Sequence, residues 1–220
     1  MRKAVVVPAI LTENPGTLDI MIQQAELFCD YVQFDIMDGL FVPTRSITYE
    51  DLARAPTRLA WEAHLMTLRP ESLLEGFRRA GARKVTFHYE AAGSPRDVIN
   101  AARRQGLQTG IAINPQTDVE AIRPYVPEVD SVLFMTVNPG AYGSEFIPEV
   151  LDKVARFRQQ YPDIEIGTDG GAKEESIARI ARSGTNIIYV GSAIFRDPDP
   201  PRAYEHLNSL AHEAAGMRAG

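Results

Sequence analysis

The sequence predicts an α/β protein, a single (β/α)8 barrel that occupies residues 1–220. Three observations predict this fold: eight short β-branched runs recur along the chain, helix-period segments separate them, and no glycine-rich dinucleotide turn follows the first run. Strict alternation of strands and helices makes the strands parallel, and eight parallel strands can close without leaving an exposed edge. A length of 220 residues with 45% apolar content suits one large core, so we expect one domain.

The predicted strands are short runs rich in β-branched residues. In chain order they are Val5–Val7, Tyr31–Ile36, Leu59–Leu65, Lys84–His88, Thr109–Ile113, Ser131–Thr136, Ile164–Thr168 and Asn186–Val190. The turn after the first run reads Pro8-Ala9-Ile10-Leu11. This turn lacks the glycines that an open doubly wound sheet, the rival fold, usually carries there.

Segments with helical periodicity fill the intervals between the strands. They are Thr17–Phe28, a short helix near Tyr49–Ala55, Glu71–Ala80, Pro95–Arg104, Asp118–Val126, Ile147–Gln160, Lys173–Ser183 and Ala203–Ala214. Several end at a glycine that leads into the next strand, as at Gly81, Gly106 and Gly184. The connection after the second strand is the least regular, because Pro43 to Pro56 leaves room only for the short helix.

Composition limits the partners and the compartment. The net charge of -6 gives no long-range attraction to nucleic acid or to an anionic membrane, so an anionic ligand must be held locally. Cys29 is the only cysteine, which fits a reducing compartment, and the apolar run near the N-terminus is too short for a signal segment or a membrane span. We expect a cytoplasmic protein whose partner is a small molecule.

Acidic and imidazole side chains occur where predicted strands end, which is where barrels place reacting groups. Gln33, Asp35 and Met37 share one face of the second strand, His64 lies near the end of the third, and Asp169 follows the seventh. Simpler roles remain open: Asp35 as a cap of a helix or turn, His64 as a hydrogen-bonded core residue, and Asp169 as a residue that shapes the glycine turn after it.

The two aspartates suit a two-base epimerisation. They are expected on strands on opposite sides of the barrel axis, so a substrate across the mouth would meet a carboxylate on each face. One group removes the proton next to a carbonyl and the other returns it on the opposite face, through an enediolate. A divalent metal ion held by His64 and both carboxylates would stabilise that anion.

Three glycine-containing turns at late strand ends are candidates for an anion site. They are Asn138-Pro139-Gly140-Ala141-Tyr142-Gly143, Asp169-Gly170-Gly171 and Val190-Gly191-Ser192-Ala193. Such turns offer backbone N–H donors without basic side chains, and barrels often bind phosphate at the loops after strands seven and eight. A phosphorylated sugar is therefore the expected substrate class.

The motifs resemble the ribulose-phosphate 3-epimerase family in order and spacing, from about Val6 to Phe195. The segments that carry the resemblance are Pro8-Ala9-Ile10-Leu11, Asp35-Ile36-Met37-Asp38-Gly39 with Phe41-Val42-Pro43, His64-Leu65-Met66, Thr86-Phe87-His88-Tyr89-Glu90-Ala91, Asn114-Pro115, Met135-Thr136-Val137-Asn138-Pro139-Gly140, Phe146-Ile147-Pro148, Asp169-Gly170-Gly171 and Gly191-Ser192-Ala193-Ile194-Phe195.

The resemblance implies a metal-dependent interconversion of D-ribulose 5-phosphate and D-xylulose 5-phosphate, in the pentose phosphate or Calvin pathways, by a homo-oligomer, commonly a dimer or hexamer. It implies that Asp35 and Asp169 are the acid/base pair, and that together with His64 they hold one divalent ion (Zn, Fe, Mn or Co). It further implies that three methionines shield the intermediate and that turn residues hold the phosphate: Met37, Met66, Met135, Gly140, Ala141, Tyr142, Gly143, Ser144, Gly170, Gly171, Gly191 and Ser192.

The chain departs from the family pattern at several positions. Gln33 stands where the family has a histidine metal ligand, and because an amide oxygen is a harder and weaker ligand than imidazole, weaker metal binding, a different metal or none follows. Ala9 replaces a serine near the substrate, Leu40 a histidine and Thr44 an asparagine, and the loop at 141–144 also differs. The alternatives are therefore an epimerase of another ketose phosphate such as allulose 6-phosphate, an aldolase or decarboxylase on a related barrel, and a sugar-phosphate-binding barrel that has lost catalysis.

Overall fold

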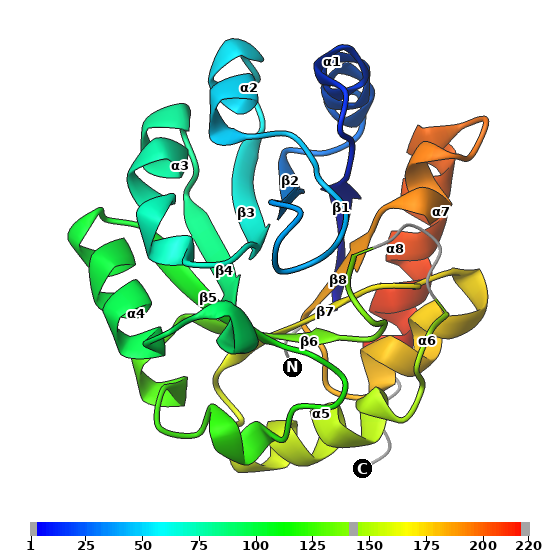
Figure 1. Ribbon diagram of the computed structural model, residues 1–220. Helices are drawn as coiled ribbons and strands as arrows, with labels where there is room; N and C mark the ends of the chain where they lie inside the picture. The colour runs from blue at the N-terminus through cyan, green and yellow to red at the C-terminus, as the bar shows by residue number, and fades with distance from the viewer. Residues whose placement is uncertain (1–3, 141–144, 217–220) are drawn as a thin grey trace.

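The computed structural model describes residues 4–140 and 145–216, and its strands form a closed parallel barrel in sequence order (Figure 1). The strands are β1 (Val5–Ile10), β2 (Tyr31–Met37), β3 (Ala60–Met66), β4 (Lys84–His88), β5 (Gln108–Ile113), β6 (Ser131–Met135), β7 (Glu165–Asp169) and β8 (Ile187–Val190). β8 pairs with β1 from Val5↔Ile187 to Pro8↔Val190 and closes the ring. The predicted (β/α)8 fold, a TIM barrel, is confirmed.

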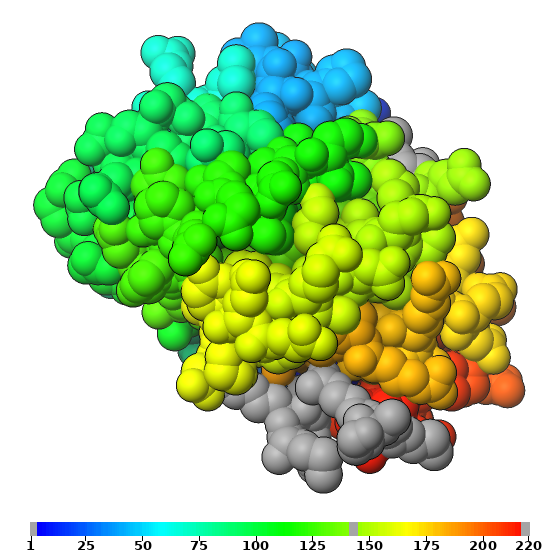
Figure 2. Space-filling view, turned by 90° about the horizontal axis from the view of Figure 1, so that it is seen from below, coloured from blue at the N-terminus to red at the C-terminus, as the bar shows by residue number. Residues whose placement is uncertain are grey.

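Helices surround the barrel, and a continuous surface of green and yellow segments covers much of the face in Figure 2. The α-helices are α1 (Pro15–Ala25), α2 (Tyr49–Arg54), α3 (Leu74–Ala80), α4 (Pro95–Arg104), α5 (Val150–Gln160), α6 (Glu174–Arg182), α7 (Ser192–Phe195) and α8 (Pro200–Gly216). The 3-10 turns are η1 (Pro70–Ser72), η2 (Tyr89–Ala91), η3 (Val119–Ala121) and η4 (Val126–Glu128). None of the described helices is both long and apolar enough to cross a membrane.

Two predicted helices differ from those observed. The prediction of a helix over Asp118–Val126 is wrong. The 3-10 turns η3 and η4 take its place, because Pro124 and Pro127 remove N–H donors that a continuous helix needs. The helix expected over Glu71–Ala80 is divided into η1 and α3. The short helix after β2 is present as α2, and its capping box joins Thr48 and Asp51.

The strands bury aromatic side chains outward and polar side chains inward. Phe34, Phe87 and Phe134 are fully buried in the main hydrophobic cluster, where helices pack on the barrel. Inside the barrel, Lys84 Nζ lies 3.1 Å from carboxylate oxygens of both Glu62 and Glu165. The buried charges are therefore paired, and they form a polar layer on the amino-terminal side of the site described next.

Candidate active site

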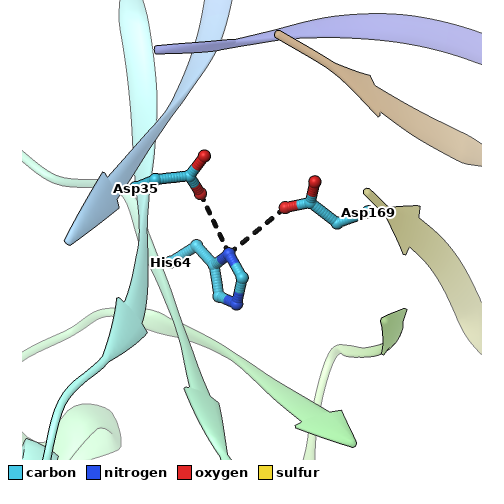
Figure 3. A group of neighbouring side chains, drawn as sticks. All are labelled: Asp35, His64 and Asp169. Carbon is cyan, nitrogen blue, oxygen red and sulfur yellow. Dashed lines mark hydrogen bonds and ion pairs between the residues drawn. The ribbon is translucent and has the colours of Figure 1, made fainter. Parts of the chain in front are cut away.

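Asp35, His64 and Asp169 converge at the carboxyl ends of β2, β3 and β7 (Figure 3). The Nδ1 atom of His64 lies 3.0 Å from Asp35 Oδ1 and 3.2 Å from Asp169 Oδ2. All three residues are buried, and the register that pairs Asp35 with His64 brings these two side chains together on neighbouring strands. The sequence-predicted cluster is thus a real spatial group.

The two aspartates do not come from directly opposite strands. Only β1 and β8 separate β2 from β7 around the ring, whereas opposite strands would have three on each side. The carboxylates nevertheless approach the same imidazole nitrogen from two sides (Figure 3). The expectation of opposite strands is corrected, while the expectation of two carboxylates at one pocket holds.

Gln33 lies in the same group and binds both carboxylates through its amide nitrogen. Nε2 donates to Asp35 Oδ1 at 3.0 Å and to Asp169 Oδ2 at 2.7 Å. The amide oxygen, Oε1, is buried and has no hydrogen-bond partner among the described residues. A buried polar atom without a partner costs stability. After rotation of the amide, this oxygen could accept a hydrogen bond from a bound molecule or coordinate an ion.

Charge and burial shift the ionisation of the group. Burial raises the pKa of Asp35 to about 6, and the nearby charge of Asp169 acts in the same direction. Burial lowers the pKa of His64, but hydrogen bonds and charges from Asp169 and Asp35 outweigh that effect and raise it to about 9. When no metal ion is bound, an imidazolium therefore lies between the two carboxyl groups near neutral pH.

His88 extends the cluster away from the carboxylates. Its Nε2 atom lies 3.0 Å from His64 Nε2, and its Nδ1 atom lies 3.4 Å from Glu90 Oε2. Burial lowers the pKa of His88 to about 4, so this ring is neutral. No site role was predicted for His88, although the alternation of Lys84, Thr86 and His88 along β4 placed a third polar side chain on the inward face.

A pocket opens beside these groups. The predicted methionines Met37, Met66 and Met135 line it, and so do the predicted turn residues Gly140, Gly170, Gly171, Gly191 and Ser192. Ala141, Tyr142, Gly143 and Ser144, also predicted for the phosphate turn, lie outside the described residues. Lys173 and Tyr189 line the pocket as well and were not predicted. The only signal for Lys173 was its position two residues after the glycine turn Gly170-Gly171.

The turn between β7 and α6 requires glycine. Gly170 and Gly171 have φ angles of 111° and 65°, a region that other residues rarely adopt. A Cβ atom on Gly170 would lie 2.4 Å from a methyl group of Val137. This close approach holds the turn next to Asp169 and against the pocket.

The residues present fit a divalent metal ion. Asp35, His64 and Asp169 offer ligand atoms that all lie within 4.8 Å of one another. Two carboxylate oxygens and one imidazole nitrogen are a common donor set for first-row divalent ions, and three protein ligands leave positions open for a substrate. The buried Oε1 atom of Gln33 would add a fourth donor if the amide rotated.

Fold and site together define a (β/α)8 barrel with a buried cluster of two carboxylates and an imidazole at the carboxyl ends of its strands, where barrel enzymes place their reacting groups. Within that class, the chain belongs to the ribulose-phosphate 3-epimerase family: the sequence model of the "Ribulose-phosphate 3 epimerase family" matches residues 5–195. The predicted resemblance, and with it an isomerase of this type, is confirmed.

Similar proteins agree with this assignment. Ribulose-phosphate 3-epimerase of Schizosaccharomyces pombe is 32% identical over 97% of this chain and 96% of its own length. Ribulose-phosphate 3-epimerase of Synechocystis sp. is 35% identical over 90% of each chain. Among solved structures, 3-hexulose-6-phosphate synthase from Salmonella typhimurium has a TM-score of 0.72 at 14% identity over 96% of this chain and 99% of that chain, which shows a shared fold.

Proposed function

We propose that the chain interconverts D-ribulose 5-phosphate and D-xylulose 5-phosphate by two-carboxylate acid/base chemistry at carbon 3. The observation that carries the proposal is the convergence of Asp35 and Asp169 on a single imidazole nitrogen beside a pocket. The names of the relatives supply the substrate class. One carboxylate takes the proton from one face of carbon 3, and the other delivers a proton to the opposite face of the enediolate.

The environment of the pair suits this role. In the ion-free site, a pKa of about 6 lets Asp35 exist in either protonation state near neutral pH, as a group must that accepts and returns a proton. Asp35, His64 and Asp169, with Gln33 after amide rotation, are the residues that would hold a divalent ion, which supplies positive charge beside the enediolate oxygens when bound.

The rest of the pocket is proposed to place and shield the substrate. Met37, Met66 and Met135 exclude bulk water from the enediolate, so that protons reach carbon 3 only through the carboxylates and the intermediate does not decompose. The turns at Gly140, at Gly170-Gly171 and at Gly191-Ser192 would bind the phosphate through backbone N–H groups.

Solvent isotope exchange tests the proposal. Purified protein with ribulose 5-phosphate in D2O should incorporate deuterium at carbon 3 and form xylulose 5-phosphate, as followed by NMR. Asp35→Asn and Asp169→Asn should each abolish both processes. Asp130→Asn is the matched control, since Asp130 accepts a hydrogen bond from the backbone of Thr109 at the other end of the barrel. Exchange that survives in both site variants would overturn the assignment.

A second candidate is the same reaction on a larger ketose phosphate such as allulose 6-phosphate. The small side chain of Ala9 lines the pocket, and Thr44 donates a hydrogen bond to the carbonyl of Gly140 at 2.5 Å. Both residues replace side chains that the family pattern has near the substrate. The ratio of kcat/KM for the two sugars decides between them, and phosphate binding without exchange on either sugar would instead indicate a non-catalytic barrel.

A further inference from the structure

A series of hydrogen bonds runs from the carboxylate pair through two buried histidines to Glu90, in the 3-10 turn η2 that follows β4. His64 Nε2 lies 3.0 Å from His88 Nε2, and His88 Nδ1 lies 3.4 Å from Glu90 Oε2. The other oxygen of Glu90 accepts hydrogen bonds from the backbone N–H of Asn114 at 2.8 Å and from the hydroxyl of Thr117. Glu90 is therefore held on one side by two donors while its second oxygen faces His88.

The direction of each hydrogen bond follows from what each group can do. An ionised carboxylate only accepts, so the nitrogen of His88 that faces Glu90 must carry the hydrogen. A neutral imidazole has one N–H, so His88 Nε2 is an acceptor, and the facing Nε2 of His64 must be the donor. The Nδ1 atom of His64 is then the nitrogen presented to Asp35 and Asp169.

We infer that Glu90 and His88 are positioning residues that keep a hydrogen on His64 Nε2, so that Nδ1 is the nitrogen of His64 that is free to interact with the carboxylate pair or with an ion.

The surroundings support fixed hydrogen-bond directions. His64 and His88 are both fully buried, and the ring of Phe41 packs on His88 with centroids 4.8 Å apart, so water has no access to replace either partner. Burial raises the pKa of Glu90, but hydrogen bonds from His88, Thr117 and Asn114 outweigh that effect and lower it. Glu90 is thus an acceptor at neutral pH.

The inference deepens the proposed function and rests on it in one respect. We call the hydrogen-bonded series Glu90–His88–His64 the relay. Its hydrogen-bond directions are the same whether Nδ1 of His64 bears a hydrogen or faces a divalent ion. If the ion site of the proposed function exists, the relay selects Nδ1 of His64 as its ligand atom. Partners that orient a ligating imidazole typically contribute about 10- to 100-fold in metal affinity.

Glu90→Gln reverses the relay without changing its shape. With the amide oxygen still accepting from Asn114 and Thr117, the amide nitrogen faces His88 and donates to it. His88 must then carry its hydrogen on Nε2, so His64 must lose the hydrogen on its own Nε2 and keep only the one on Nδ1, toward Asp35 and Asp169. The matched control is Glu128→Gln, because Glu128 has similar exposure (27% against 21%) and is paired with Arg96 on the surface.

The test is 15N NMR of the histidine rings in the metal-free protein, followed by titration with Mn2+. In the wild type and in Glu128→Gln, His88 should be protonated on Nδ1 and bare on Nε2. In Glu90→Gln both assignments should reverse, and Mn2+ affinity should fall about 10- to 100-fold.

Two outcomes overturn the inference: a wild-type His88 protonated on Nε2, which needs no variant to detect, or a folded Glu90→Gln with unchanged tautomers. If the wild type has the expected tautomers, Glu90→Gln reverses them and neither protein binds Mn2+, the relay is supported and the proposed metal site fails.

Discussion

Gln33 determines how the carboxylate pair is held. Its amide nitrogen donates to both carboxylates, whereas an imidazole at this position would offer a stronger ligand to a borderline ion such as zinc. We therefore expect Gln33→His to raise zinc affinity by about 10- to 100-fold. Competition with a chromogenic chelator measures this, with Gln23→His on the exposed face of α1 as the control. Equal affinities for Gln33→His and the wild type would place Gln33 outside the coordination of the ion.

The ion-free protein should lose stability as the pH rises. The pKa of His64 is about 9 in the folded chain against 6.5 as its ordinary value, so its contribution is fully present below pH 6.5 and is lost as the pH rises through 9. In the presence of a chelator, Tm should fall as the pH is raised from 6.5 through 9. His64→Asn should show a smaller fall over the same range, and an equal fall in both proteins would contradict the assigned cause.

The sequence predicted which residues belong to the site where they lie at the end of a strand. It did not predict contacts that depend on the register between neighbouring strands. Asp35, His64 and Asp169 could be named because parallel strands bring their carboxyl ends to one rim. The contact between His64 and His88 depends on the pairing of β3 with β4 and on the rotation of both rings, which alternation alone does not determine. The role of Glu90 could not be predicted for the same reason, because its hydrogen-bond partners on the segment after β5 are distant in sequence.

At the scale of elements, the turn between β7 and α6 offers a sharp test. Gly170→Ala forces a positive φ on a residue with a Cβ atom and drives that atom into Val137. We expect a loss of about 1–3 kcal/mol in the free energy of unfolding, together with weaker binding of inorganic phosphate. Urea denaturation and phosphate titration measure the two effects. Gly93→Ala is the control, since no described atom lies within 4 Å of its added Cβ, and equal losses in both variants would reject the explanation.

Strands were predicted more accurately than helices, and the reason is local. The strand Lys84–His88 and the helix Pro95–Arg104 were predicted with the observed bounds, because apolar alternation and a Ser-Pro start are strong signals within a few residues. The helix expected over Asp118–Val126 was not found, because its apolar spacing was given more weight than its internal proline.

At the scale of the whole molecule, the closed ring predicts cooperative unfolding. Every strand is hydrogen-bonded to two neighbours, and β1 and β8 join the two ends of the chain, so no described strand can leave without breaking two ladders. We expect a single calorimetric transition with equal van't Hoff and calorimetric enthalpies, as for one domain. Two resolved transitions in the metal-free protein would show that the chain does not unfold as the proposed single unit.

The order in which the ring is built affects a chain that is still on the ribosome. Asp35 and His64 emerge early, but Asp169 and the strand that seals the barrel against β1 are made near the end of translation. A nascent chain of four or five strands therefore has Asp35 and His64 without Asp169, and two unpaired sheet edges. It should not react with sugar phosphates, and it should bind chaperones, until β7 and β8 have left the exit tunnel.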